Sequence, residues 1–352
     1  MGQPKKIIID PYCAVNYAFY YIKGLRQCFP NVPIKWNSKM FPYRFDSLQE
    51  FRQGIGIILE YENYSQKIYI DFHDPDIILE QPYKWCDVYG KINIKEDDCH
   101  RDKIVPIGPS FGIRYKSLIS SLLGGMVNYI RLSDRGWKPS FKEYIHGYLY
   151  PFVRRKTYKW YTMNPDEKEG YIFAASTLWY DAKTDRTTNN YRAQYCRLCK
   201  KLMPFFEGGL FIIKGATTVN EFPKYAEYSK TYEDLIIDKR ISMKDYLKKT
   251  SQSVFVFNTP SVQGCHGWKL AEYLAMGKAM ISTTLENVMP GEFRDGGEYV
   301  RINTEEGMEN AILYLRDNPD VRKKLKINAK KYFNNYLSPE AVIQRLVNRG
   351  NR

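Results

Sequence analysis

The chain has 352 residues, of which 44% are apolar and 26% are charged, a composition typical of a globular protein and not of a disordered one. This length exceeds what one ordinary core needs and predicts two domains of roughly 150 to 180 residues each. The formal net charge of +14 indicates an anionic partner, which could be nucleic acid, anionic lipid or a phosphorylated small molecule. The basic residues are dispersed and no nucleic-acid-binding motif accompanies them, which disfavours nucleic acid.

The N-terminus runs from two lysines directly into a short apolar stretch, unlike a secretory signal. No segment reaches the roughly 18 uninterrupted apolar residues that span a bilayer. Seven cysteines, an odd number, favour reduced thiols, and Cys196 and Cys199 are interpreted as two thiols on a helix and not as zinc ligands. We therefore expect a cytoplasmic protein, with or without peripheral attachment at the inner face of the cell membrane.

Strand-like and helix-like segments alternate in the first half of the chain. Strands are predicted at 5–10, 32–37, 51–63, 67–74 and 101–114, and helices at 17–29, 115–132 and 140–155. A polar stretch with Pro and Gly at 162–170 is the best candidate for a linker. This alternation predicts a mostly parallel sheet with helices on both faces.

The second half repeats the alternation. Strands are predicted at 171–176, 209–215, 232–242, 253–258 and 278–283, and helices at 192–206, 243–252, 268–276, 304–318, 319–337 and 338–349. Open α/β domains bind ligands outside the carboxyl ends of their strands. The loops that follow the strands are therefore the segments in which we expect the functional residues.

The stretch "NTPSVQGCHGWKLAEYLAMGK", residues 258–278, follows one of these strands. Its glycines and the helix N-terminus behind them favour an anion. Glu272 lies off the apolar stripe of that helix, which leaves two interpretations. It could form a salt bridge with Lys269 on a solvated face, or it could bind the hydroxyl pair of a sugar.

This stretch resembles the donor-binding motif of GT-B glycosyltransferases of the group 1, or family 4, type, and the resemblance extends over roughly residues 170–345. It implies an α/β fold of two Rossmann-like, doubly wound domains that face each other across a cleft. The expected domains are 1–165, which would bind the acceptor, and 166–335, which would bind the donor. The terminal helix at 336–352 would return to the first domain.

The resemblance implies that Glu272 holds the ribose of a nucleotide-sugar whose diphosphate lies near Ser261, Gly264, Gly267 and Lys269. The family has a second Glu eight positions before this one, where this chain has Gly264. That departure leaves the sugar and the stereochemical outcome open, and His266 or Gln263 could take over a sugar contact. Further donor contacts are expected from the cations Lys183, Arg186 and Lys214 and, at the base, from Arg240 and Ile241.

In the first domain, the loop after the first strand is expected to line the acceptor site with Tyr12, Ala14 and Asn16. His73 and Asp74 end a predicted strand and are candidates for a general base, although Asp74 could equally belong to a simple turn. The resemblance implies no metal and no cofactor beyond the nucleotide-sugar itself. The expected activity is transfer of a hexose to a glycan or to an acceptor on a lipid diphosphate at an anionic membrane surface, in the assembly of capsule or O-antigen.

Two other functions stay open. A catalytically inactive, transferase-like scaffold would explain the missing Glu at position 264. A basic nucleic-acid-binding protein would explain the net charge, but its expected contiguous patch and motif are missing from the sequence.

Overall fold

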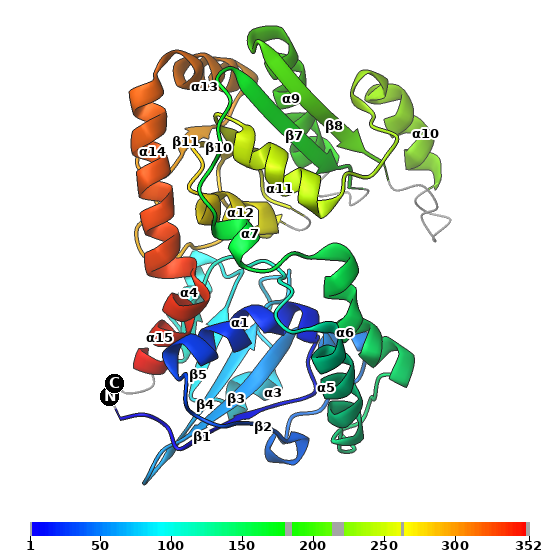
Figure 1. The fold of residues 1–352 in the computed structure, drawn as a ribbon, viewed down its shortest axis with the longest axis vertical. Helices are drawn as coiled ribbons and strands as arrows, with labels where there is room; N and C mark the ends of the chain where they lie inside the picture. Colours follow the sequence, from blue (N-terminus) through cyan, green and yellow to red (C-terminus); the bar gives the residue numbers. More distant parts are fainter. Residues whose placement is uncertain (1, 180–184, 213–221, 262–263, 350–352) are drawn as a thin grey trace. The chain divides into compact units, whose positions relative to one another are not determined.

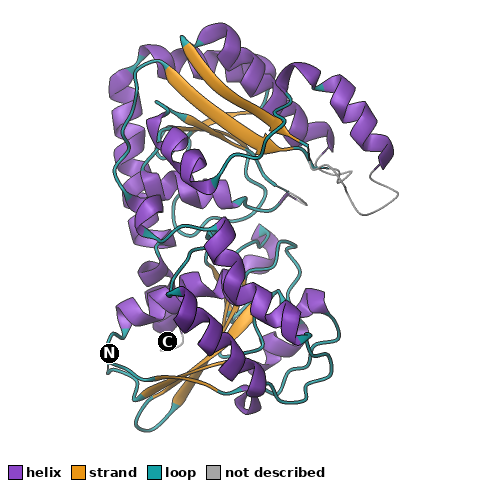
Figure 2. Cartoon of the chain, turned by 45° about the vertical axis from the view of Figure 1, so that its right-hand side comes forward, coloured by secondary structure: helices purple, strands orange, loops and turns teal. Residues whose placement is uncertain are grey.

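The computed structural model describes residues 2–179, 185–212, 222–261 and 264–349. The chain divides into two compact units (Figure 1). Unit 1 comprises 1–159, 287–291 and 334–352, and unit 2 comprises 160–286 and 292–333. In both units the strands run between helices (Figure 2), and the prediction of an α/β fold is confirmed.

Unit 1 is built on a six-stranded sheet of order β2-β1-β3-β4-β5-β6. Its strands are β1 (Lys6–Ile9), β2 (Ile34–Trp36), β3 (Gly54–Glu60), β4 (Ser65–Asp71), β5 (Val88–Lys91) and β6 (Ile104–Pro106). Its helices are α1 (Val15–Cys28), η1 (Ser38–Met40), α2 (Leu48–Phe51), α3 (Glu80–Trp85), α4 (Glu96–Cys99), α5 (Leu118–Ile130), α6 (Phe141–Arg154) and α15 (Pro339–Arg349). The sequence had not predicted β5.

The sheet of unit 1 departs from the mostly parallel arrangement expected. β3 pairs antiparallel with both β1 and β4. The reason is the short turn between β3 and β4, closed by a hydrogen bond from the Tyr61 amide to the Tyr64 carbonyl (2.9 Å). So short a connection can join only antiparallel neighbours, since a parallel pair needs a crossover of a dozen residues or more.

The C-terminal helix α15 packs beside α1 in unit 1. A Cβ at Gly24 of α1 would lie 2.1 Å from the Pro339 carbonyl oxygen, so only glycine permits this close approach. On the side that faces the sheet, the side-chain Nε2 of Gln66 in β4 donates to the Val347 carbonyl of α15 (3.1 Å). The short segment 287–291, which the sequence placed with the second domain, also belongs to unit 1: the Val288 amide donates to the Ile94 carbonyl (2.9 Å).

Unit 2 contains two groups of parallel strands. β7 (Tyr171–Thr177) pairs with β8 (Phe205–Phe211), and β10 (Met280–Thr283) lies between β9 (Val256–Asn258) and β11 (Val300–Ile302). Its helices are α7 (Lys159–Thr162), η2 (Asp185–Asn189), α9 (Asn190–Leu202), α10 (Phe222–Thr231), η3 (Glu233–Leu235), α11 (Met243–Gln252), α12 (Trp268–Met276), α13 (Glu305–Asp317) and α14 (Pro319–Tyr332), with η5 (Phe333–Leu337) crossing into unit 1. The amide of Val254 donates to the Tyr171 carbonyl (3.0 Å), which joins the two groups edge to edge.

The strand predicted at 232–242 is wrong. The segment forms the 3₁₀ turn η3 and a single bridge between Leu210 and Ile236. Its apolar residues pack as one cluster against β8, with Leu235 2% exposed. The apolar residues that resemble a strand in the sequence are therefore apolar because they are buried, and the segment does not form an extended strand. Among the described residues, no helix is both long and apolar enough to cross a bilayer.

Candidate functional site

A cavity of about 250 Å³ lies in unit 2 at the carboxyl ends of β9, β10 and β11. The edge at which parallel strands end is where open α/β folds bind ligands. Four segments line it: Thr187 and Thr188 of η2 with Tyr191 of α9; Thr259, Pro260, Ser261 and Gly264 after β9; Thr283, Thr284 and Glu286 at and after the end of β10; and Ile302 and Asn303 at the end of β11. Thr259 is buried, and its Oγ1 has no hydrogen-bond partner among the described residues, so a polar group entering the cavity would satisfy it.

Lys269 lies in the first turn of α12, directly behind the loop that lines this cavity. Its Nζ donates to the Ala175 carbonyl (2.5 Å) and to Ser176 Oγ (2.8 Å), both at the end of β7. Burial, with a further contribution from the nearby Arg192 charge, lowers the pKa of Lys269 to about 7. Both acceptors are neutral oxygens, so an anion here would stabilise the ammonium form.

A second cation meets the same strand end. Arg192 of α9 donates from Nη1 to the Thr177 carbonyl (2.9 Å). Burial lowers its pKa to about 10, and its charge acts on Lys269. Gly267, the N-cap of α12, makes no side-chain capping bond. Two desolvated cations beside a helix N-terminus form an arrangement suited to a phosphate group.

Sequence reasoning had named Lys269 but missed Arg192. Ser176, at the end of β7, accepts a hydrogen bond from Lys269. Lys183 and Lys214 lie outside the described residues, as does Gln263. Arg186 falls in η2, but its side chain also lies outside the described part. No pattern in the sequence singles out Arg192, which is simply the first residue of the helix predicted at 192–206.

Glu272 is only 3% exposed, so the interpretation that placed it on a solvated face of α12 is wrong. Its carboxylate acts on two groups, raising the pKa of Tyr246 in α11 and that of Lys269. In each case burial has the larger effect on the pKa. The Glu272 carboxylate therefore lies close enough to Lys269 to favour the charged form of that side chain.

Gly264 has a left-handed backbone (φ +72°). A Cβ at this position would lie 2.3 Å from Oε2 of Glu286, so the Glu286 carboxylate occupies the space that a larger residue at 264 would need. Sequence reasoning missed Glu286, which lies 22 positions further along the chain, after β10. A carboxylate is thus present beside position 264, supplied by another loop.

The other donor candidates lie in the loops around this cavity. Ser261 lines it, and its amide donates to the Cys265 carbonyl (2.8 Å). His266 is 3% exposed, unlike an ordinary polar loop residue. Arg240 is exposed, and Ile241 is partly exposed beside it in the segment before α11.

A cavity of about 240 Å³ in unit 1 involves two of the acceptor candidates. Ala14 and Asn16 line it, together with Cys13, Val15, Tyr17, Phe51, Arg52, Glu143, Tyr144, His146, Gly147 and Tyr150. Tyr12 is buried away from it: its hydroxyl donates to the Ser133 carbonyl (2.5 Å) and its ring stacks on Phe45. His146, which the sequence analysis had not named, comes from α6.

His73 follows β4 and is held from several sides. Its amide donates to Asp71 Oδ1 (2.8 Å), and its carbonyl accepts from Lys91 Nζ (3.1 Å). Gln53 Nε2 contacts its Nε2 (3.3 Å), while Nδ1 has no partner among the described residues. Burial lowers the pKa of His73, so the imidazole is neutral near pH 7, the form that a base requires.

Asp74 is exposed next to His73, and its carbonyl accepts from Asn93 Nδ2 (3.0 Å). Its charge raises the pKa of Tyr17, after the larger effect of burial. Since Tyr17 lines the cavity of unit 1, Asp74 lies near that cavity.

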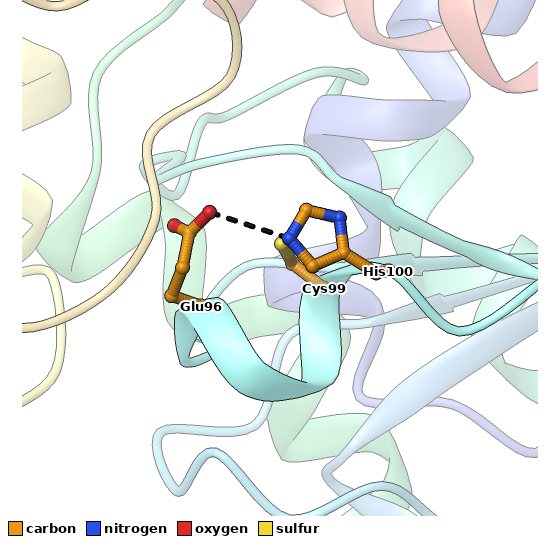
Figure 3. A group of neighbouring side chains, drawn as sticks. All are labelled: Glu96, Cys99 and His100. Atoms are coloured by element: carbon orange, nitrogen blue, oxygen red, sulfur yellow. Dashed lines mark ion pairs between the residues drawn. The ribbon is translucent and has the colours of Figure 1, made fainter.

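Three potential metal ligands gather on α4. Glu96, Cys99 and His100 project from one turn, and His100 Nε2 lies 3.4 Å from Glu96 Oε1 (Figure 3). The Glu96 and His100 side chains are 74% and 76% exposed. A structural zinc site has four ligands, and this exposed trio offers three, so it makes no case for a metal centre.

Part of the chain matches a known family of proteins. Residues 198–348 match a family model described as glycosyl transferase-like. This segment runs from α9 to α15 and includes α12. The match agrees with the resemblance to glycosyltransferases that the sequence shows.

Three solved structures illustrate what the chain is similar to. The C-terminal domain of a glycosyl transferase group 1 family protein (LpcC) from Francisella tularensis is 14% identical, with 49% of this chain and 86% of that chain covered and a TM-score of 0.33. A glycosyltransferase from Rickettsia africae is 13% identical (75% and 63% covered, TM-score 0.39). TarM from S. aureus, in complex with fondaparinux, α-GlcNAc-glycerol and UDP, is 10% identical (80% and 49% covered, TM-score 0.43).

The chain thus spans less than two thirds of the last two structures. No curated protein sequence matches it.

Proposed function

We propose that the protein is a glycosyltransferase that moves a hexose from a nucleotide-sugar to a glycan or lipid-linked glycan acceptor. The observation that carries this proposal is the pair of desolvated cations, Lys269 and Arg192, at the strand edge of the unit that matches the glycosyl transferase-like family. The donor diphosphate would bind to these cations and to the N-terminus of α12. The sugar would occupy the neighbouring cavity.

Within that cavity Glu286 and Thr259 are the candidates for sugar contacts, and the resemblance assigns the ribose to Glu272. The two cations would neutralise the diphosphate, the task that a divalent metal performs in other phosphate-binding sites. We therefore propose a reaction without a metal and without a cofactor beyond the nucleotide-sugar.

The acceptor would bind unit 1 at the cavity lined by Ala14 and Asn16. His73 is the candidate base for its hydroxyl, because desolvation keeps the imidazole neutral near pH 7. The basic net charge of +14 supports an acceptor carried on a lipid diphosphate at an anionic membrane. Surface polysaccharide assembly by a cytoplasmic, peripherally attached enzyme is the role that fits such an acceptor.

The test is a calorimetric titration with UDP, GDP and their sugars, followed by an assay for hydrolysis or transfer. We expect binding of one nucleotide class and turnover of its sugar. Binding of a nucleotide without turnover of any sugar would favour the inactive scaffold. Failure to bind any nucleotide would contradict the proposal as a whole.

A further inference from the structure

Helix α5 of unit 1 exposes its apolar side. The apolar residues on this side are between 39% and 81% exposed: Leu118, Ile119, Leu122, Leu123, Met126, Val127 and Ile130. They recur at helical spacing and form one stripe along a helix about 20 Å long. All 13 residues of α5 are uncharged.

The inner side of α5 is made of small and polar residues, the reverse of an ordinary surface helix. Its buried residues are Ser121, Gly125 and Asn128. Asn128 Nδ2 donates to the Tyr148 hydroxyl (2.9 Å) of α6, the helix that lies beside α5 (Figure 1). The polar side is therefore already used inside the unit, and the apolar stripe faces outward. A contiguous exposed patch of this kind marks an interaction surface.

Cations and aromatic rings border one end of the stripe. Arg131, Lys138 and Lys142 are exposed there, and Lys138 Nζ lies 4.7 Å from the centre of the Tyr129 ring. Phe141, 49% exposed, meets the same ring edge to face at 5.2 Å. The two acids nearby are engaged locally: Asp134 accepts from the Gly136 amide and Glu143 from the Ser140 amide.

We propose that the α5 stripe is a membrane-docking surface that inserts into the interface of an anionic bilayer. An uncharged apolar helix face with cations and aromatic rings at its border has the composition of interfacial helices, in which the apolar side chains enter the acyl boundary and the cations meet anionic headgroups. A second copy of the chain fits less well, because a two-fold contact would bring the same cations together. This proposal builds on the membrane attachment proposed above and identifies the surface responsible for it.

The test is flotation of the full-length chain with phosphatidylethanolamine–phosphatidylglycerol vesicles and with phosphatidylcholine vesicles. We expect the protein to float with the anionic vesicles, and I119E/L123E to partition at least about tenfold more weakly, since two charges would enter the acyl boundary. The matched control is I327E in α14 of unit 2, where Ile327 is 59% exposed. It should float like the unaltered protein.

Three results would overturn the proposal. One is flotation of I119E/L123E at the level of the unaltered protein, and another is failure of the unaltered protein to bind anionic vesicles. The third is a dimer in sedimentation that I119E/L123E converts to monomer, without vesicle binding by either, which would assign the stripe to a second copy. Nucleotide titration of the unaltered protein and of each variant keeps the two proposals separate. An unaltered protein that binds nucleotide but does not float would contradict the docking surface alone.

Discussion

The buried cations Lys91 and Arg135 of unit 1 and the two cations of the candidate site in unit 2 have opposite kinds of partner. In unit 1, Lys91 lies 3.1 Å from the Asp71 carboxylate and both side chains are 0% exposed, while Arg135 lies 2.7 Å from Asp10. In unit 2, Lys269 donates to a carbonyl and a hydroxyl, and Arg192 donates to a carbonyl.

We infer from this difference that the cations of unit 1 serve the stability of the fold and that those of the site in unit 2 serve ligand binding. A cation that a buried carboxylate neutralises fastens the loop around it, whereas a cation with neutral acceptors keeps charge available for an anionic ligand. Lys91 also binds the carbonyls of His73 and Pro75, so its pair with Asp71 fixes the loop after β4. Lys269 contacts the end of β7, but its two acceptors there are uncharged and leave its charge without a hydrogen-bonded counter-ion.

The largest expected effect comes from breaking a pair in unit 1. Lys91→Met leaves the Asp71 carboxylate buried without its counter-ion, and we expect a loss of about 3–5 kcal/mol in the free energy of unfolding. Urea denaturation measures it. Lys269→Met is the matched control, since it removes a partly buried lysine whose hydrogen-bond acceptors are neutral, and it should change stability by less than about 1 kcal/mol. Equal losses in both variants would contradict the comparison.

Lys269→Met should have little effect on stability but a large effect on the affinity for nucleotide. Lys269→Met removes a charge-assisted contact to the diphosphate, and we expect UDP or GDP to bind about 10- to 100-fold more weakly. Lys323→Met, on the exposed face of α14, is the control and should bind as the unaltered protein does. Calorimetry measures the dissociation constants of both variants. An unchanged affinity in Lys269→Met would show that Lys269 does not bind the diphosphate.

The pH dependence of binding follows from the depressed pKa. Below about pH 7 Lys269 is protonated in the free protein, and above it the side chain loses the charge that attracts the diphosphate. The last phosphate proton of the nucleotide dissociates near pH 6, so the charge of the diphosphate itself is nearly constant from pH 7 to pH 9. We expect affinity to fall about tenfold from pH 7 to pH 9, and to stay flat over that range in Lys269→Met. A flat profile in the unaltered protein would show that Lys269 does not carry the binding charge.

The smallest effect concerns the loop that brings Glu286 to position 264. Gly264→Ala adds left-handed strain and a clash with Glu286, and we expect a loss of about 1–2 kcal/mol in stability. Gly296→Ala has almost the same φ (+70°) with nothing within 4 Å of the added Cβ, so it isolates the strain. Thermal denaturation should find the Gly264 variant less stable than the Gly296 variant. Equal values would mean that Glu286 does not fill this space.

Local patterns in the sequence were enough for several features of the fold. The helix predicted at 268–276 matches α12, because an apolar stripe at helical spacing ends at Gly277, a left-handed C-cap (φ +65°). The strand predictions failed where contacts from distant segments decided the outcome. The segment at 232–242 has an apolar pattern that its cluster with β8 explains. β5 and β11 lack an apolar run, because Gly90 and Lys91 end β5 and Arg301 is the middle residue of β11.

By itself, the sequence determined the α/β class, the position of α12 behind a glycine-containing loop and the candidacy of Lys269, since all three depend on residues close together in the chain. Only the tertiary structure decided that Arg192 meets the same strand end as Lys269 and that Glu272 is buried. It also decided that the Glu286 carboxylate fills the space beside Gly264. The physical reason is that a strand edge collects loops separated by tens of residues, and the burial that shifts a pKa or selects a glycine arises only when those loops pack together.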